Sequence, residues 1–558
     1  MKRLKYKLST AGENKDKKMV NNFGPEHKLE FDECSIKAVC SASPTLSAIQ
    51  EVILLHLKEL SFYLLELKKM GACNEVMKHC ILDTLSLIVI NSNLNQKQYK
   101  ELILSLENNL SQAKKLYKEE CEKNEKNPHF IKSHFKHNKD FSLSGGIKKG
   151  EKYIKERVTT LSIEQKNLFD IMLMILKSTY IRAFELVKLG EDPKAACMAV
   201  LSMLNAMNFT DTPEEKIIAQ IDNNSSVFYD TLRGLIAKKE ECYGKMSQNE
   251  VSFSTSAPAK AIMVVGCNIK ELEMVLKATD GRGVDVYTHG LDMLMAHTFP
   301  KLRGYKHLKG HFGQWCDNAL LDFVMFPGAI LMTRHAVQKT EYLYRGRLFT
   351  TDLIAPIGVI RIDNEDFEPL IQAALTAKGF RKGQQRPSRQ VGFSEEALSK
   401  KVNEVMDKME KGEIKHIYVV GLLNYEDEHK DYFDKFFKLV PKDCFIFSFA
   451  HSKNGKNIMH LDSIFDYTLL CMLLELLSKR KPLREISMSV FLTSCNRHTV
   501  ATIFSLKKLG VKNIYMSKCQ PNLANPSLIE TMKNKFGVKE FFDPKEDIEN
   551  TFGDKGKP

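Results

Sequence analysis

The stretch AKAIMVVGCNIKELEMVLKATDGRGVDVYTHG, residues 259–290, decides the fold class of this chain. It begins with AKAIMVVG, an apolar run that predicts a short buried strand, and the residues that follow have the apolar spacing of a helix. GVDVYTHG then predicts a second strand. Apolar strands that alternate with helices are typical of a parallel sheet with helices on both faces.

The alternation continues toward the end of the chain and divides into two series of strands. PGAILMT and LIAPIGVIRI extend the first series, and HIYVVG, CFIFSF, ISMSVFLT and NIYMS make up the second. The stretch GFRKGQQRPSRQVG (379–392) lies between the two series and predicts a hinge. We therefore expect two Rossmann-like α/β domains with mainly parallel sheets, at residues 258–390 and 395–552.

Residues 31–250 instead show the apolar spacing of helices, in two copies at 46–110 and 161–240. Each copy contains a long apolar segment that ends in a Lys-rich turn and a glycine, Gly71 or Gly190, which suits a helix C-cap. A second helix follows in each copy. The sequence therefore predicts a duplicated helical-bundle domain before the two α/β domains.

Much of the basic charge lies outside these expected domains or between their parts. Residues 1–30 and 553–558 predict tails, and the Lys- and Asn-rich segment 121–157 predicts a flexible, exposed insertion between the helical copies. The net charge is +13; residues 1–20 hold seven Lys and Arg against two acids, and residues 114–157 hold thirteen against seven. Charge clustered in this way is typical of solvated sequence. We therefore do not expect a nucleic-acid partner.

The composition is that of a soluble globular protein of several domains. The chain has 558 residues, of which 43% are hydrophobic and 27% charged, and no apolar run approaches the ~18 residues of a membrane helix. Its thirteen cysteines are spread singly without a CxxC pair, which predicts reduced thiols. A phosphate-binding glycine motif is absent. We expect a cytoplasmic location, with organelle targeting by the basic N-terminus as the alternative.

Six stretches of the chain share their pattern with one metalloenzyme family. They are VVGCNIKELEMVL (264–276), GRGVDVYTHG (281–290), GYKHLKGHFGQW (304–315), FPGAILMT (326–333), YRGRLFTT (344–351) and VATIFSLKKLGVKNIYM (500–516). Together they resemble the hybrid-cluster (prismane) family, which is related to carbon monoxide dehydrogenase and contains hydroxylamine and nitric oxide reductases. The resemblance runs from about Cys34 to Phe552. It implies a prismane-like fold, a hybrid iron–sulfur–oxygen cluster and a 4Fe–4S or 2Fe–2S cluster.

The resemblance also implies which positions should hold the hybrid cluster. In the family, a histidine, two carboxylates and four cysteines are the ligands. The histidine position falls on Cys267, and the first glutamate position falls on Asp292 or, if one extra residue is placed differently, on Leu291. The four cysteine positions fall on Ala336, Leu423, His451 and Asp466, and the second glutamate position falls on Asn496. Alanine and leucine supply no ligand to iron.

The second cluster of the family has also lost ligand residues in this sequence. Its four cysteine positions fall on Asn22, Pro25, Cys34 and Cys40, so two of the four thiols remain. Two thiolates do not hold a cluster that needs four. We therefore expect that both clusters are lost and that no cofactor is bound.

Two alternatives remain open for the altered cluster site. Cys267, Asp292, His451 and Asp466 could form a first shell for one divalent ion. We favour arginine–carboxylate pairing instead, because Arg334 and Arg497 lie beside lost ligand positions and arginine pairs well with carboxylates. His289 and His297 match framework residues of the family, and we expect them to be structural and bonded to the backbone.

The sequence therefore predicts a pseudoenzyme of the hybrid-cluster family that acts through binding or structural contacts, with a protein partner and no membrane. The first alternative is an oxidoreductase of the parental type, which would reduce hydroxylamine or nitric oxide with a rebuilt metal centre. A third hypothesis is a protein that binds a ligand or a metal in the vacated cavity. Iron and sulfide content separates the first two hypotheses.

Overall fold

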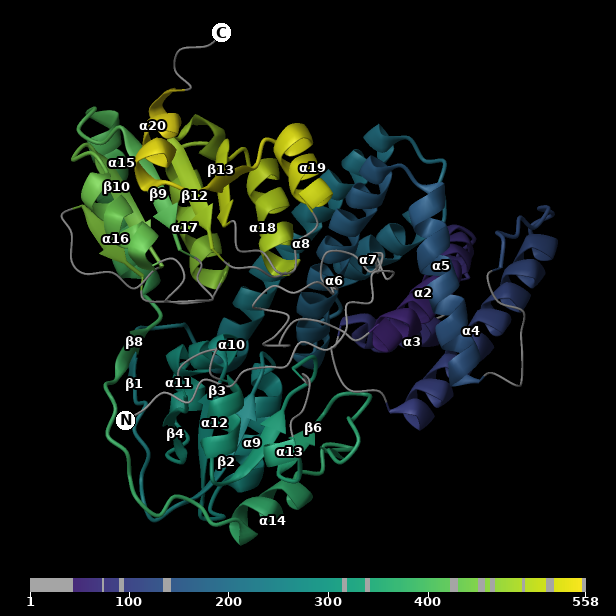
Figure 1. Cartoon of the computed structure of the whole chain (residues 1–558), viewed down its shortest axis with the longest axis horizontal. Coiled ribbons are helices and arrows are strands. Elements are labelled where there is room, and N and C mark those ends of the chain that lie inside the picture. The colour runs from purple at the N-terminus through teal and green to yellow at the C-terminus, as the bar shows by residue number, and fades with distance from the viewer. Residues whose placement is uncertain are drawn as a thin grey trace, which may run out of the picture.

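The structure is a computed structural model. It describes residues 44–72, 75–89, 95–133, 142–313, 319–336, 342–421, 430–449, 457–461, 467–493, 497–517 and 526–553. Figure 1 shows a helical domain on the right, a first α/β domain below it and a second α/β domain at the upper left. Along the chain, a helical region is followed by two six-stranded parallel sheets with helices between the strands, which confirms the predicted fold class. The predicted residue boundaries of the domains stay predictions.

The helical domain is built from two units with matching helix lengths. The first unit contains α2 (Pro44–Lys69), α3 (Glu75–Val89) and α4 (Gln96–Lys123), and the second contains α6 (Ile163–Lys188), α7 (Lys194–Ala206) and α8 (Glu214–Tyr243). In chain order, the helices have 26, 15 and 28 residues in one unit and 26, 13 and 30 in the other. The predicted duplication is therefore present, with a third helix completing each unit.

The two long apolar helices end in the same way. Gly71 and Gly190 have φ angles of 73° and 86°, which glycine adopts without strain. The N–H of the residue after each glycine reaches back over the last turn, from Ala72 to Leu67 O at 2.9 Å and from Glu191 to Leu186 O at 3.0 Å. This is the Schellman arrangement, and it confirms the two predicted C-caps.

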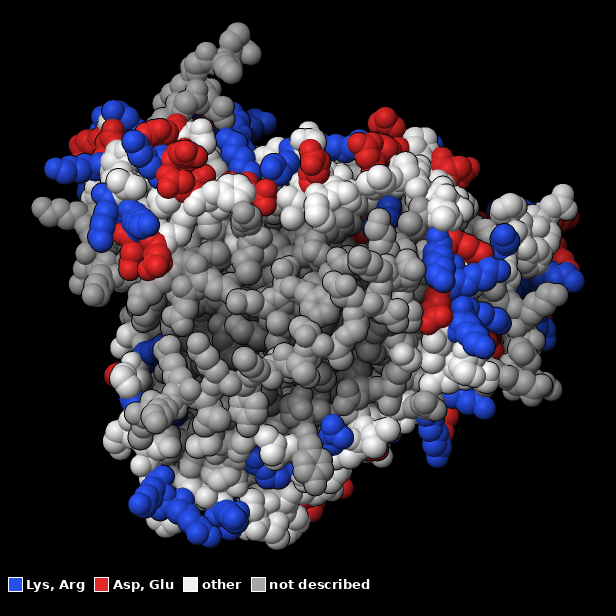
Figure 2. Space-filling model, in the orientation of Figure 1, with Lys and Arg blue, Asp and Glu red and all other residues white. Residues whose placement is uncertain are grey.

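The predicted insertion at 121–157 is wrong for its second half, because α5 (Leu143–Thr160) is a helix that packs against α2. A Cβ atom at Gly150 would lie 2.0 Å from Ala48 O, so this glycine allows the two backbones to approach closely. Leu143, Gly150 and Ile154 are buried and lie at helical spacing. The apolar face of α5 was not recognised in the sequence because glycines occupy some of its positions. The opposite face carries several lysines, and Figure 2 shows Lys side chains of this region in blue on the right.

The first α/β domain contains a sheet of six parallel strands in the order β4-β3-β2-β5-β6-β7. The strands are β2 (Lys260–Val265), β3 (Val284–His289), β4 (Leu308–His311), β5 (Ala329–Met332), β6 (Leu348–Thr350) and β7 (Ile360–Arg361). The helices between them are α9 (Ile269–Thr279), α10 (Leu291–Leu294), η2 (Met295–Thr298), α11 (Pro300–Arg303), α12 (Ala319–Met325) and α13 (Tyr342–Arg345), and α14 (Glu368–Thr376) follows. Only two residues of the predicted strand LIAPIGVIRI are a strand, since Pro356 cannot donate to a ladder.

The second α/β domain repeats this topology with the order β11-β10-β9-β12-β13-β14. Its strands are β9 (His416–Val420), β10 (Cys444–Ser448), β11 (Ile458–His460), β12 (Met488–Leu492), β13 (Asn513–Ser517) and β14 (Lys539–Phe541). Its helices are α15 (Glu395–Glu410), α16 (Lys430–Leu439), α17 (Tyr467–Arg480), η4 (Leu483–Glu485), α18 (Arg497–Lys508), α19 (Pro526–Phe536) and α20 (Pro544–Gly553). In both sheets the first and fourth strands are neighbours, so the strand order reverses between them.

The predicted hinge at 379–392 is an extended segment, called the strap below. It runs antiparallel to the residues that lead into β2. β8 (Arg389–Val391) pairs antiparallel with β1 (Asn249–Val251), and the two strands lie side by side in Figure 1. Bridges between Thr255 and Gln384 and between Ala259 and Phe380 extend this pairing. In the described part of the chain, none of the helices combines the length and apolar character needed to cross a membrane.

Candidate functional site

The loops after β2 and β5 meet where the strand order of the first sheet reverses. Thr333 directly follows β5, and its N–H and hydroxyl group both donate to Val265 O, at 2.9 and 3.1 Å. Gly266 has a φ of 130°, and a Cβ atom there would lie 2.1 Å from Thr333 Oγ1 and 2.7 Å from the Cβ of Ala336. This close approach places the loops that carry Cys267 and Ala336 side by side. Open α/β sheets bind their ligands at such a point.

A buried carboxylate, Glu271, holds these loops together. It lies in the first turn of α9, where Asn268 caps the helix by accepting from the Glu271 N–H at 3.2 Å. Glu271 Oε2 accepts from the Arg334 N–H at 3.1 Å and from Thr351 Oγ1 at 2.6 Å. Burial raises the pKa of this carboxyl. Glu271 thus joins the loops that follow β2, β5 and β6.

Arg334 carries a positive charge from the β5 loop to the helical domain. Its side chain is nearly buried, with the residue 8% exposed, and its guanidinium lies 4.7 Å from the ring centroid of Phe184 in α6. Arg334 Nη2 lies 3.4 Å from Asp83 Oδ1 in α3. The predicted pairing with Asp292 or Asp466, whose side chains lie outside the described residues, stays a prediction, but Arg334 does pair with a carboxylate. The carboxylate comes from the helical domain and not from a position aligned with a cluster ligand.

His335 makes the next contact between the two domains. Its φ is 68°, which is unusual for a residue other than glycine, and its N–H donates to Asp352 Oδ1 at 2.9 Å. The ring Nε2 lies 3.1 Å from the hydroxyl of Tyr180 in α6. Burial, together with the charges of Arg334 and Arg497, places the pKa of His335 well below its ordinary value. This imidazole is therefore neutral at neutral pH.

The second α/β domain reaches the same part of the helical domain through the start of α18. Arg497 Nη1 donates to Val89 O at the end of α3, at 3.3 Å. The ring of His498 is next to this contact, and burial, Arg182 and Arg497 lower its pKa well below the ordinary value. Both arginines that the sequence selected, Arg334 and Arg497, thus contact α3. They approach it from different α/β domains.

His289 and His297 belong to a buried network at the carboxyl ends of β3 and β4. Thr288 Oγ1 lies 2.8 Å from His297 Nε2 and 2.8 Å from His311 Nδ1. His289 Nε2 lies 3.2 Å from Asp322 Oδ2 in α12, and its ring stacks on that of His311. The two histidines are thus held by a hydroxyl and a carboxylate, so the expectation of backbone partners is wrong. Burial lowers the pKa of His297 to about 4.

The described part of the chain contains a minority of the positions that were aligned with cluster ligands. Cys267 and Ala336 lie on the adjoining loops, and the backbone of Asp292 lies in α10 after Gly290. Outside the described residues lie Leu423, His451, Asp466, Asn496, Asn22, Pro25, Cys34 and Cys40. Among the residues that are described, no three His, Cys, Asp or Glu side chains form a group that could hold a metal ion. The metal site of Cys267, Asp292, His451 and Asp466 stays a prediction.

Sequence reasoning did not select Glu271, His335, Tyr180 or Asp83, although they make the contacts at this site. One signal was present in α6, where every residue from Asn167 to Leu186 is buried. A helix that is buried on all sides and still contains polar residues has to satisfy them against other elements. For the other three residues the sequence pattern gives no comparable signal, because their partners are distant in the chain.

Comparison with known proteins identifies the family of this architecture. The model of the Prismane/CO dehydrogenase family matches residues 30–464. The chain belongs to the Prismane/CO dehydrogenase family. A hydroxylamine reductase of Acidiphilium cryptum is 25% identical over 541 residues, covering 93% of this chain and 96% of the relative. A hydroxylamine reductase of Syntrophobacter fumaroxidans is 25% identical over 542 residues, covering 95% of this chain and 99% of the relative.

Two further similarities of this prismane-family chain are more limited. A hydroxylamine reductase of Thermodesulfovibrio yellowstonii is 31% identical over 305 residues, which are 52% of this chain and 56% of the relative. Among solved structures, an acetyl-CoA synthase/carbon monoxide dehydrogenase with NiZn and NiNi iron–sulfur clusters has a TM-score of 0.47 and 12% identity. That similarity covers 92% of this chain and 83% of the solved chain.

The residues at the β2 and β5 loops do not fit the cluster that the prismane family implies. A hybrid cluster needs thiolates on its sulfide-rich side. Ala336 offers a methyl group, which packs beside Gly266, and the guanidinium of the neighbouring Arg334 lies against Phe184 and Asp83 of the helical domain. Cys267 is the one thiol on these two loops.

Proposed function

We propose that this chain is a cluster-free member of the prismane family that acts by binding a protein partner and does not reduce hydroxylamine. The observation that carries the proposal is the pair of residues after β5. Ala336 stands at the position aligned with the first cluster cysteine, and Arg334 lies two residues before it with a nearly buried guanidinium. A methyl group and a guanidinium replace the electron-rich surroundings that iron requires.

The contacts of these loops support the same proposal. Arg334 and His335 hold the first α/β domain against α3 and α6 through Asp83, Phe184 and Tyr180. Buried ionic groups must find partners inside the protein, and Arg334 has found them in the helical domain. The β5 loop then serves as a structural link between domains. A protein whose former reaction centre has become a domain contact acts through its surface.

The names of the relatives favour one alternative. The relatives from Acidiphilium cryptum and Syntrophobacter fumaroxidans, which match over nearly the whole chain, are hydroxylamine reductases. An active protein would need a rebuilt metal centre, since Ala336 and Leu423 supply no ligand. A metal held by Cys267, Asp292, His451 and Asp466 is the third hypothesis, and its ion would be a divalent metal rather than a cluster.

Metal content and turnover test the proposal together. The full-length protein is expressed with abundant iron, purified anaerobically and assayed for iron, zinc, sulfide, visible absorbance and hydroxylamine reduction by reduced viologen. We expect no sulfide, no absorbance of an iron–sulfur cluster and no turnover above a preparation from cells without the gene. The hydroxylamine reductase of Syntrophobacter fumaroxidans, purified in parallel, is the positive control.

Each other outcome contradicts the proposal in a different way. Sulfide with turnover would establish the parental reductase with a rebuilt centre. Stoichiometric zinc without sulfide, lost in Cys267→Ser, would establish the single-ion site. The purified protein could also lack metal and activity but melt at a higher temperature after clusters are reconstituted. This result would show that the site can still bind a cluster and that the cluster stabilises the fold.

A further inference from the structure

A cavity of about 380 Å³ lies away from the β2 and β5 loops, at the carboxyl ends of β3 and β4. Its walls come from the residue after β4, from α12 and from the strap between α14 and β8. The lining residues are Phe312, Leu321, Asp322, Met325, Phe380, Gln384 and Arg386. We infer that this cavity binds a small molecule that joins a flat ring with N–H donors to a phosphate-like anion, as a purine mononucleotide does.

The apolar wall of the cavity is suited to a flat ring. Phe312 and Phe380 lie in contact, with ring centroids 6.0 Å apart, and both belong to the apolar cluster below the cavity. Leu321 and Met325 form a lip and are 61% and 66% exposed. Large apolar side chains exposed beside aromatic rings are covered when a ring enters. Phe312 and Phe380 are themselves only 5% and 8% exposed, so an entering ring would mainly cover Leu321 and Met325 and the small part of the two aromatic rings that faces the cavity.

The anion-binding side of the cavity is the guanidinium of Arg386. It lies 6.0 Å from the ring centroid of Phe312, and Nη2 donates to Gln384 Oε1 at 3.3 Å. In the described part of the chain it makes no ion pair. Arginine with open donors recognises phosphate and carboxylate groups in a bidentate way. Arg386 is thus available to a ligand.

The strap holds Arg386 in place and adds further positive charge. Arg386 and Ser254 exchange two hydrogen bonds, of 3.0 and 3.1 Å, and Gln384 N–H donates to Thr255 Oγ1 at 3.1 Å. The sequence from 377 to 390 contains five Lys and Arg and no acid. Figure 2 shows this strap as a blue surface at the lower left. A positive surface at the mouth of a cavity attracts an anionic ligand.

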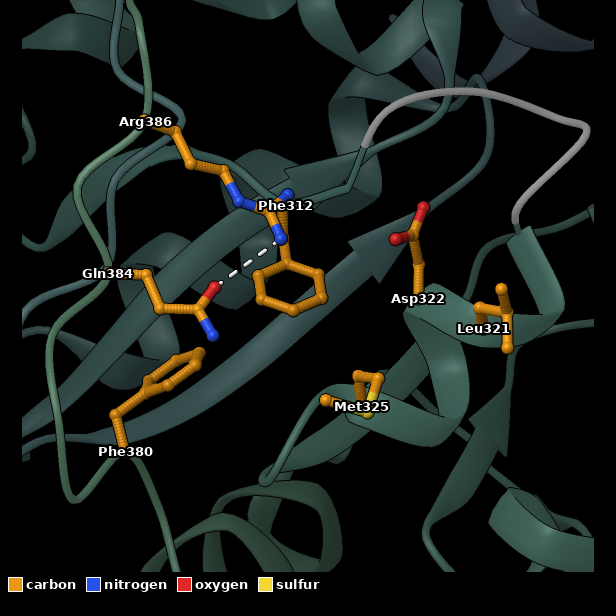
Figure 3. Close-up of a pocket in the computed structure, with 7 residues that line it drawn as sticks. All are labelled: Phe312, Leu321, Asp322, Met325, Phe380, Gln384 and Arg386. Atoms are coloured by element: carbon orange, nitrogen blue, oxygen red, sulfur yellow. Dashed lines mark hydrogen bonds between the residues drawn. The ribbon is translucent and has the colours of Figure 1, made fainter. Parts of the chain in front are cut away.

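The opposite side of the cavity holds a carboxylate that can accept N–H donors. Figure 3 shows Asp322 and Arg386 on opposite sides of the Phe312 ring. Asp322 Oδ2 lies 3.2 Å from His289 Nε2, and the absence of a side chain at Gly313 leaves room for this carboxylate, since a Cβ atom there would lie 2.0 Å from Oδ2. A guanine ring presents two neighbouring N–H groups on one edge, which suits a carboxylate. The cavity therefore offers a hydrogen-bond acceptor (Asp322), an apolar wall and a cation (Arg386) to one ligand.

The inference does not depend on the loss of the clusters, because none of the lining residues is aligned with a cluster ligand. It is tested by calorimetric titration of the full-length protein with guanosine 5′-monophosphate, guanosine and inorganic phosphate. We expect the nucleotide to bind more tightly than either half, since each half engages one side of the cavity. Arg386→Gln should weaken nucleotide binding about 10- to 100-fold, as loss of a charge-assisted hydrogen bond does.

Matched variants separate a built site from general attraction. Arg381→Gln removes an exposed arginine of the same strap that does not line the cavity, and it should leave the affinity nearly unchanged. Leu321→Ser alters the exposed lip without touching the core and should weaken binding. Inosine 5′-monophosphate lacks one amino group and should bind less tightly than the guanosine nucleotide, and Asp322→Asn should remove that difference.

Three results would overturn the inference. Equal losses in Arg381→Gln and Arg386→Gln would mean that the basic strap attracts anions without a defined site. An absence of binding by the nucleotide at millimolar concentration, with a wild-type melting curve, would mean that the cavity does not take this class of ligand. Binding of inorganic phosphate as tight as that of the nucleotide would likewise exclude the ring-binding wall.

Discussion

The two α/β domains have the same strand order but are joined to the helical domain in different ways. One hydrophobic core runs from α6 into the second sheet and includes Leu176, Val419 and Phe504. The first sheet has separate cores on its two faces, represented by Val264 and Met263. Among the described buried residues of the first α/β domain, Ile354 alone belongs to the shared core.

Apart from Tyr243 at the end of α8, whose ring lies 5.9 Å from that of Phe299 in one of these cores, the contacts that join the first α/β domain to the helices are mainly polar. Tyr180 meets His335, Arg334 meets Asp83, and Asn95 Nδ2 donates to Ala355 O at 3.1 Å. Hydrophobic burial is non-directional and accumulates over large areas, whereas hydrogen bonds depend on individual groups. Two domains of the same topology can therefore differ in their attachment. The second is fused, in that it shares a hydrophobic core with the helical domain, and the first is only attached, mainly through polar contacts. We expect the first α/β domain to unfold separately from the rest.

Among the substitutions that test this difference, Phe504→Ala in α18 should have the largest effect on stability. Phe504 is 1% exposed and its ring meets that of Phe536 at 4.7 Å in the shared core. The substitution should cost about 3–5 kcal/mol of unfolding free energy. Hydrogen exchange measured by mass spectrometry should increase in both α6 and β12, and much less in β2 and β3. Phe349→Ala, in a core of the first sheet, is the matched control and should show the reverse.

A fall in pH should destabilise mainly the first α/β domain, whereas Phe504→Ala should destabilise mainly the helical domain and the second α/β domain. Burial lowers the pKa of His297 to about 4 and holds the pKa values of His311 and His335 well below the ordinary value. The unfolded chain binds these protons below pH 6.5 and the folded chain does not, so stability falls as pH falls through that value. Each histidine contributes up to about 1.4 kcal/mol per pH unit. The raised pKa of Glu271 opposes this, but as one group against three.

Hydrogen exchange at pH 7 and pH 5 measures this effect region by region. Protection of β2, β3 and β5 should decrease at pH 5 before that of β9 and β12. The second α/β domain is not free of the effect, since the pKa of His498 is lowered as well. If protection decreased equally in both sheets, the distinction between an attached and a fused domain would be lost.

The sequence was sufficient to predict the strands that form the centre of each sheet. The runs that became β2, β3, β5, β9, β10, β12 and β13 are apolar because both faces of a central parallel strand are buried. The sequence did not reveal β6, an inner strand of three residues, nor the edge strands β4, β11 and β14. Their residues, LKGH, IMH and KEF, are short and partly polar, as suits strands at or near a sheet edge.

The candidate site was predictable in position and less so in its contacts. The glycines after the first strand of each sheet, Gly266 and Gly421, both have positive φ angles of 130° and 82°, and both stand in motifs that the sequence already singled out. The selection of Arg334 rested on its place beside a lost ligand. Its partner Asp83 lies 251 residues away, and no local pattern links two such positions.

The smallest expected effect concerns one hydrogen bond between the helical domain and the first α/β domain. Tyr180→Phe keeps the ring in α6 and removes the hydroxyl that lies 3.1 Å from His335 Nε2. A buried polar group that loses its partner costs about 1–3 kcal/mol. We expect the loss to be local, with faster hydrogen exchange in the β5 loop and in Asp352 and little change in the second sheet.

The matched variant is Thr531→Val, which removes the hydroxyl that accepts from Asn167 Nδ2 at 3.0 Å between α6 and α19. Both substitutions delete one buried hydroxyl contact of the same helix. The second α/β domain also shares its apolar core with α6, so Thr531→Val should leave the docking of that domain intact. Domain separation by Thr531→Val and not by Tyr180→Phe would show that polar contacts, rather than the shared core, hold the second domain in place.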